Sequence, residues 1–525
     1  MSRLAGARRR VGPPPATVAL PVTVALVWLV TWPRTVPTLF GDHGSYISMA
    51  ERVLAGDRLY VDVWDNKGPL FYDEIAVVRL VSRYADIVLE VAWVALACWA
   101  VLSLCRSAGV RRGLALLVTL AGVPVVVTGA AYGPGMTHLP GVALCLATTA
   151  LAVRRRWVLA GALTGVLLFS KEIMVPIAAV AVVTAAWHHR SWRGFARAVV
   201  SALVVSAAVV AGLYARGELG GFVTSITSNL DYADGDLAQS RYGSVVGHLL
   251  NAMPEDGRGG GLVTIAAVAL VLVTGGRAGG RGARGARGGD REATGAEENP
   301  PLAQPELVRD LTVATLVAAI VVIAATAPWP HHSQSLYVAG CLALVLVALR
   351  LSPRHTPGEQ QWHPARVAGT AVLVAFLLGG ALHPYYYLES AREVPSRIVA
   401  LSHDSVDSAV ITQQPRVHTY ARAGSNDDGA HAVGLRSYAL VCPRFHHYPF
   451  ESSAVLDGIL ACLPSADALI VDQTIRDEPN SPQWNAYVAK VRALVGNGYT
   501  CVPTSRSQVC VKTSLYVAPG TSVPS

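Results

Sequence analysis

Charged residues are scarce in this sequence. Only 15% of its 525 residues are Asp, Glu, Lys or Arg, 52% are hydrophobic, and the mean hydropathy is +0.40. Soluble proteins carry about 25% charged residues, so the composition excludes an ordinary soluble enzyme and predicts a polytopic membrane protein. The net charge of +8 comes mostly from arginines in loops that the positive-inside rule places in the cytoplasm. It therefore does not indicate nucleic-acid binding.

Other familiar patterns are also missing. The eight cysteines form no CxxC pair, which argues against a structural zinc site, and no internal repeat stands out. No small-residue cleavage site lies between the first apolar run, 16–32, and Asp42. We therefore interpret that run, which follows Arg8-Arg9-Arg10, as a membrane helix with the N-terminus inside, and not as a cleaved signal peptide.

Apolar runs alternate with arginine-rich and arginine-poor loops. The runs are 16–32, 87–104, 113–131, 139–153, 157–170, 173–187, 198–214, 262–274, 311–327, 336–349 and 367–382. Several are shorter than the roughly 20 residues of a straight span. Since every arginine cluster falls on one side, the pattern predicts an α-helical transmembrane domain over 1–384 with about eleven spans, the N-terminus in the cytoplasm and the C-terminus outside.

Two segments differ from this pattern. The Gly/Ala/Arg-rich stretch 275–305 lacks apolar residues to bury and predicts a disordered cytoplasmic linker. The remainder, 385–525, predicts a soluble extracytoplasmic α/β domain. Its predicted strands are 409–412, 438–441 and 468–471, and its predicted helix is 484–495.

Four of the eight cysteines lie in this C-terminal domain, and the other four lie in predicted spans. Outside the cytoplasm an even set of cysteines predicts disulfides. Of the three possible pairings we favour Cys442 with Cys462 and Cys501 with Cys510, the latter across a hairpin.

The first predicted extracytoplasmic loop, 33–86, is far richer in charge than the apolar runs around it. Within Phe40 to Tyr72, residues 45–55 predict a short amphipathic helix with Asp42 just ahead of it. The turn-forming run 65–70 then carries an exposed cation, Lys67. An acid, an interfacial helix and a cation beside a membrane span suit a reaction on a lipid-linked phosphate.

This loop resembles the first extracytoplasmic loop of the GT-C membrane glycosyltransferases, above all bacterial relatives of protein O-mannosyltransferases and of the lipid A aminoarabinose transferase. The matching positions are Asp42, Tyr46, Ala50, Gly56, Tyr60 and Lys67-Gly68-Pro69-Leu70. One departure concerns a second acid that many members carry at the start of the fourth span. This chain has Met136-Thr137-His138 there. Either His138 replaces that acid in lining the cavity, or a metal or acceptor contact that other members make is absent, which leaves the acceptor class and any metal dependence open.

The resemblance implies an inverting glycosyltransferase that uses a polyprenyl-phosphate sugar and an envelope glycan, lipid or protein acceptor. Asp42 is then the catalytic base and Lys67 binds the donor phosphate, with Arg52 and Arg58 assisting. Asp65 is a turn residue or a partner for Lys67. No cofactor is expected.

Plainer interpretations stay open for these residues. Asp42 would cap the helix that follows, and Lys67 would extend to the lipid headgroups. Intramembrane charges favour a functional role for Lys171 and Glu172, but a mutual ion pair explains them equally well.

His331 and His332, in the run PWPHHS, line the cavity or belong to an interfacial loop. A two-histidine metal site lacks carboxylates nearby in the sequence. The run 231–236 resembles a calcium loop, but the bidentate glutamate that such a loop needs is missing.

Two other classes compete with a glycosyltransferase of the cytoplasmic membrane. A non-catalytic lipid flippase or glycan transporter would explain the many spans, but not the charged first loop and the C-terminal domain. A polysaccharide polymerase would place arginines in large outer loops, and here the outer loops are not arginine-rich.

Overall fold

The computed structural model describes most of the helices and much of the C-terminal part. Its described residues are 22–28, 31–32, 41–82, 84–128, 135, 137–234, 305–325, 334–352, 395, 406–424, 435–444, 453–472, 475–477, 481–504 and 507–518. The predicted spans 262–274 and 367–382, and all but the last residue of the predicted linker 275–305, lie outside these residues.

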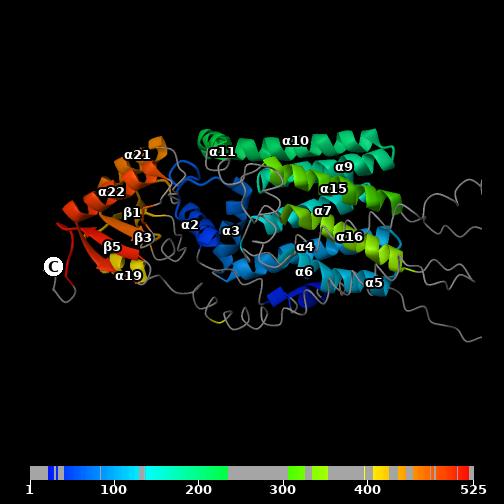
Figure 1. Ribbon diagram of the computed structural model, residues 1–525, viewed down its shortest axis with the longest axis horizontal. Helices are drawn as coiled ribbons and strands as arrows, with labels where there is room; N and C mark the ends of the chain where they lie inside the picture. Colours follow the sequence, from blue (N-terminus) through cyan, green and yellow to red (C-terminus); the bar gives the residue numbers. More distant parts are fainter. Residues whose placement is uncertain are drawn as a thin grey trace, which may run out of the picture.

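The apolar runs form a bundle of helices (Figure 1). They are α4 (Ala85–Ser107), α5 (Arg112–Leu117), the π-helical turn η1 (Val118–Gly122), α6 (Val123–Thr128), α7 (His138–Val153), α8 (Trp157–Leu168), the 3-10 turn η2 (Glu172–Met174), α9 (Val175–His188), α10 (Trp192–Ala215), α15 (Pro305–Ala325) and α16 (Leu336–Leu351). In the described part of the chain, α4, α10 and α15 are long and apolar enough to cross a membrane. The protein is a multi-pass membrane protein, and the number of about eleven spans stays a prediction.

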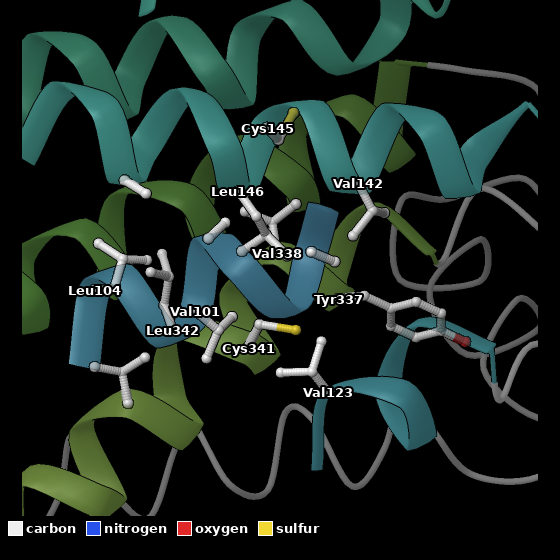
Figure 2. Close-up of a cluster of buried hydrophobic side chains, with 14 of the residues drawn as sticks. Val101, Leu104, Val123, Val142, Cys145, Leu146, Tyr337, Val338, Cys341 and Leu342 are labelled. Atoms are coloured by element: carbon white, nitrogen blue, oxygen red, sulfur yellow. The ribbon is translucent and has the colours of Figure 1, made fainter. Parts of the chain in front are cut away.

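Helices α7 and α16 lie in the middle of the bundle (Figure 1), and nearly all of their residues are buried. Figure 2 shows side chains of α4, α6, α7 and α16 meeting in one apolar cluster, which includes Val101, Leu104, Val123, Val142, Leu146, Val338, Cys341 and Leu342. By contrast, α10 exposes apolar side chains such as Val200 and Leu203. An apolar outer face is expected where lipid replaces water around a helix.

Helices α2 (Gly41–Leu54) and α3 (Pro69–Val81) fill the first loop and lie with α11 (Leu219–Asp234) at one end of the bundle (Figure 1). The prediction that Asp42 lies ahead of the first helix is wrong, because α2 begins at Gly41 and Asp42 lies in its first turn. The polar side chains of the predicted amphipathic helix do not face solvent, since residues 43–52 are all buried. Charged partners from α3 and from the C-terminal part cover the polar face of this helix.

The C-terminal part contains a five-stranded sheet of order β2-β1-β3-β5-β4. Its elements are α19 (Val406–Thr412), β1 (Thr419–Ala423), β2 (Ala439–Leu440), α21 (Ser453–Cys462), the 3-10 turn η4 (Leu463–Ser465), β3 (Ala468–Asp472), α22 (Pro482–Gly498), β4 (Tyr499–Pro503) and β5 (Ser507–Lys512). Strand β1 pairs in parallel with β2 and β3, whereas β5 is antiparallel to β3 and β4. The predicted strand at 409–412 is wrong, because these residues belong to α19. A short apolar run suits a buried helix as well as a strand.

Both predicted disulfides are confirmed. Cys442 is bonded to Cys462 at the end of α21, and Cys501 is bonded to Cys510, its direct neighbour across the β4–β5 pair. The four remaining cysteines are free and buried within α4, α7 and α16.

Candidate active site

Lys67 lies in a turn that is held from two sides. The Asp65 carboxylate accepts hydrogen bonds from the Asn66 backbone N–H, at 2.6 Å, and from the Tyr72 hydroxyl. The Ser225 hydroxyl of α11 donates to the Asp65 carbonyl oxygen at 2.9 Å. Asp65 is therefore a turn residue. The half-buried Lys67 ammonium donates to the Asn66 side-chain oxygen at 2.5 Å.

The backbone that follows Lys67 packs against the end of α8. The Leu70 N–H donates to the Phe169 carbonyl oxygen at 3.0 Å. A Cβ atom on Gly68 would lie 2.1 Å from that same oxygen, so only glycine allows this close approach. Because only Ser170 separates Phe169 from Lys171-Glu172, the Lys67 turn lies close to this predicted charged pair.

Lys171 in turn lies beside the first turns of α7. A Cβ atom on Gly141 would lie 3.3 Å from the Lys171 Cβ, and His138 begins the same helix. Lys171 and His138 are both buried, with exposed fractions of 5% and 1%, whereas Glu172 is half-buried. The structure thus brings the Lys67 turn, Lys171 and His138 to one end of the bundle.

The first turn of α2 reaches the same end. His43 Nδ1 lies 3.0 Å from the Gly135 carbonyl oxygen, just ahead of α7. Gly135 has φ +87°, and a Cβ atom there would lie 2.0 Å from His43 Nδ1. Burial, helped by the charge of Arg79 and opposed by the bond to Gly135, lowers the pKa of His43 to about 4, so its imidazole is neutral at neutral pH. Asp42 directly precedes His43, and its side chain lies outside what the structure describes.

Arg52 and Arg58 are each engaged by a carboxylate of the first loop. Arg52 is ten residues beyond Asp42, about 15 Å along α2. Its guanidinium pairs with Asp57 at 2.5 Å and donates to the Tyr438 carbonyl oxygen at 2.6 Å. Arg58 is 52% exposed and pairs with Asp62 at 3.0 Å. Among the described residues, neither arginine hydrogen-bonds to residues 65–70. His331 and His332 lie outside the described residues.

A buried group of charges close to this end was missed in the sequence. Arg79 of α3 pairs with Glu51 of α2 at 2.6 Å and with Asp86 of α4, and Glu51 also pairs with Arg436. The side chains of Arg79, Glu51 and Asp86 are at most 2% exposed. One signal was available, because Asp86 and Glu90 belong to an apolar helix, where acids are rare and mark functional sites.

A small pocket lies where the first turn of α2 meets α3 and α4. Its lining includes His43, Glu74, Glu90, Trp93 and Gly135. Burial, together with repulsion from Glu90, raises the pKa of Glu74 to about 8, so this carboxyl group holds a proton at neutral pH. Within the described ranges no three His, Cys, Asp or Glu residues are placed to bind a metal ion.

Comparisons with known proteins identify the fold. No protein-family profile matches the sequence, and no curated protein matches it. Among solved structures, ArnT from Cupriavidus metallidurans bound to undecaprenyl phosphate matches with a TM-score of 0.55 and 16% identity, covering 96% of this chain and 100% of that chain. The same protein in the apo state matches with a TM-score of 0.55 and 17% identity, covering 96% and 99%. The chain therefore has the GT-C fold, as the first-loop motif predicted.

Proposed function

We propose that this GT-C-fold protein is an inverting glycosyltransferase of the cytoplasmic membrane. It moves a sugar from a polyprenyl-phosphate donor to an envelope glycan, lipid or protein on the outer face of the membrane. The observation that carries the proposal is the likeness, over 96% of this chain, to ArnT bound to undecaprenyl phosphate. A carrier lipid of that kind suits a site at the end of an apolar bundle, where its tail meets the helices and its phosphate meets the first loop.

In the proposed reaction the acceptor hydroxyl oxygen attacks the anomeric carbon on the face opposite the phosphate. The bond between the anomeric carbon and the phosphate oxygen breaks, and the phosphate leaves with the bonding electrons. Asp42 takes the acceptor proton as general base. Lys67 stabilises the charge that develops on the departing phosphate.

The surroundings of Lys67 support its role. Its ammonium hydrogen-bonds to the neutral amide of Asn66, and it forms no ion pair with a carboxylate among the residues that the structure describes. Its charge is therefore available to a phosphate. Two further polar side chains, Lys171 and His138, are buried at the same end of the bundle. Lys171 directly precedes η2, and His138 is the first residue of α7.

The test is sugar transfer by the purified protein from polyprenyl-phosphate sugars, with products identified by mass spectrometry. A contact between lysine and phosphate contributes about 1.5–3 kcal/mol, so Lys67→Ala should lower kcat/KM about ten- to a hundredfold. Lys67→Arg should recover part of the loss, and Lys490→Ala, at an exposed ion pair, should have no effect. Asp42→Asn should abolish transfer while donor binding remains.

Two results would count against these roles. Early melting of Lys67→Ala with normal specific activity would make the lysine structural. Near wild-type transfer by Asp42→Asn would remove Asp42 from its role as base. If the wild-type protein transfers no sugar from any polyprenyl-phosphate donor, the proposed function itself is wrong.

The proposal also requires a fixed orientation in the membrane. We expect residues 275–305 in the cytoplasm and residues 385–525 outside, by the distribution of arginines. Single cysteines introduced by Gly285→Cys and Ser425→Cys should react with a membrane-impermeant reagent from opposite sides. Labelling of both from the same side contradicts this orientation.

A further inference from the structure

One short segment of the C-terminal part, residues 436–444, contacts the first loop at several points. The Arg436 guanidinium pairs with Glu51, and the Arg52 guanidinium donates to the Tyr438 carbonyl oxygen at 2.6 Å. The Glu51 side chain is 1% exposed, whereas that of Arg436 is 49% exposed. An arginine at the surface of the C-terminal part thus reaches a carboxylate buried in α2.

The same segment holds the stretch just ahead of Lys67. The Trp64 N–H donates to the Pro443 carbonyl oxygen at 2.6 Å, and Trp64 forms an isolated parallel bridge with Arg444. The Arg444 guanidinium carbon lies 3.7 Å from the centre of the Trp64 ring. A cation over an indole face is attracted by the ring. Since Trp64 precedes Lys67 by only three residues, these contacts restrain the approach to the Lys67 turn.

Hydrogen bonds within this stretch connect Trp64 to Lys67 through a strained residue, Tyr60. Tyr60 has φ +67°, a left-handed conformation that residues with a side chain keep only where their surroundings hold them. The Tyr60 N–H donates to the Val63 carbonyl oxygen, and its hydroxyl donates to the Lys67 carbonyl oxygen, both at 2.6 Å. A chain of direct contacts therefore leads from Trp64 through Val63 and Tyr60 to Lys67.

Segment 436–444 is itself fixed by a disulfide. Strand β2, within this segment, pairs with β1 at only two positions. The bond from Cys442 to Cys462 ties the segment covalently to α21. Cys442 stands between Tyr438 and Arg444, the residues at which the segment meets α2 and Trp64.

We propose that segment 436–444 is a positioning element for the Lys67 turn. The positioning residues are Arg444 in the segment and its partner Trp64 in the first loop. The Cys442–Cys462 disulfide anchors the segment. The inference deepens the proposed function and rests on it, because the kinetic consequence concerns the lipid-linked phosphate that Lys67 binds. Release of the segment lets the turn move, which weakens donor binding more than it slows the chemical step.

The first test does not depend on the reaction. Hydrogen exchange at the amides of residues 59–67 is measured on the purified full chain. It should be faster in Arg444→Ala than in the wild type, and intermediate in Arg444→Lys, because an ammonium also binds over an indole. Arg492→Ala, which removes an exposed ion pair with Asp477, should leave it unchanged. Unchanged exchange in Arg444→Ala overturns the inference, whether or not the protein transfers a sugar.

The second test uses the two disulfides as a matched pair. The double variant Cys442→Ser/Cys462→Ser should raise the KM for a polyprenyl-phosphate sugar about three- to tenfold, the effect of losing one or two contacts of this kind. The double variant Cys501→Ser/Cys510→Ser should not raise it. Arg444→Ala, which keeps both disulfides, should also raise the KM and serves if the first double variant does not fold.

The outcomes separate the two proposals. An unchanged KM in Arg444→Ala, or a fall in kcat alone in both double variants, would mean that the segment only supports folding. Failure of the wild type to transfer a sugar would contradict the proposed function, and the exchange measurement would then decide on the positioning element by itself.

Discussion

Arg79→Ala is expected to destabilise the protein more than any exposed substitution. Arg79 of α3 lies between α2 and α4, where it pairs with Glu51 at 2.6 Å and with Asp86. The side chains of Arg79 and Glu51 are 0% and 1% exposed. Removal of the guanidinium leaves two carboxylates in a space that water does not reach.

The size of the effect follows from this burial. Removing one partner of a buried ion pair costs about 3–5 kcal/mol, because the remaining charge stays uncompensated. Glu51 keeps its pair with Arg436, so we expect the lower end, about 3 kcal/mol. The matched control is Arg492→Ala, whose pair with Asp477 is 56% and 64% exposed. Such surface pairs contribute about 0–1 kcal/mol.

Thermal unfolding in detergent measures the difference between the two variants. A triple variant, Arg79→Met with Glu51→Gln and Asp86→Asn, should recover most of the stability because it leaves no buried charge in this group. If Arg79→Ala melts no earlier than Arg492→Ala, the buried pair contributes nothing. A triple variant as unstable as Arg79→Ala would show that shape, and not charge, is what the site requires.

Two further predictions concern pH and packing. The pKa of Glu74 rises from 4.5 to about 8 on folding, so the folded state holds a proton that unfolding releases, and stability should fall as the pH rises through this window. Glu74→Gln should flatten the decline in melting temperature between pH 5.5 and 8.5, and an unchanged decline contradicts this. Gly68→Ala should displace the Lys67 turn from Phe169 and cost about 1–3 kcal/mol with a loss of transfer. Gly220→Ala, where a Cβ atom meets nothing within 4 Å, should be tolerated, and equal behaviour of the two variants would refute the steric argument.

Much of the bundle was predictable because length and hydropathy act locally. The predicted run 139–153 became α7, His138–Val153, and 336–349 became α16, Leu336–Leu351. Their ends coincide with arginines or polar residues that the apolar interior excludes. The strand predicted at 409–412 was wrong because a run of only four residues, three of them apolar, has no periodicity that distinguishes a strand from a helix.

Candidate site residues could be proposed from the sequence only where the residues next to them in the chain indicate a role. Lys67 could be proposed from the sequence because the turn 65–70 is polar and follows a short helix, and its role stays a prediction. Glu51 and Arg79 were not, since their pairing joins residues 28 apart, and Arg436 reaches Glu51 across 385 residues. A charged residue in a loop is expected to be exposed, and only the tertiary contacts reveal that α2 is covered on both sides.

The pairing of these charges also distinguishes four cations in the described part of the first loop by how available each is to an anion. Arg52, Arg58 and Arg79 each pair with a carboxylate, at 2.5 Å, 3.0 Å and 2.6 Å. A phosphate that approached them would have to compete with that carboxylate, and at Arg79 it would also have to lose its water. Lys67 bonds instead to the neutral amide of Asn66, which a phosphate oxygen can replace with a stronger, charge-assisted bond. On these electrostatic grounds Lys67 is the one of these four cations that we propose binds a lipid-linked phosphate.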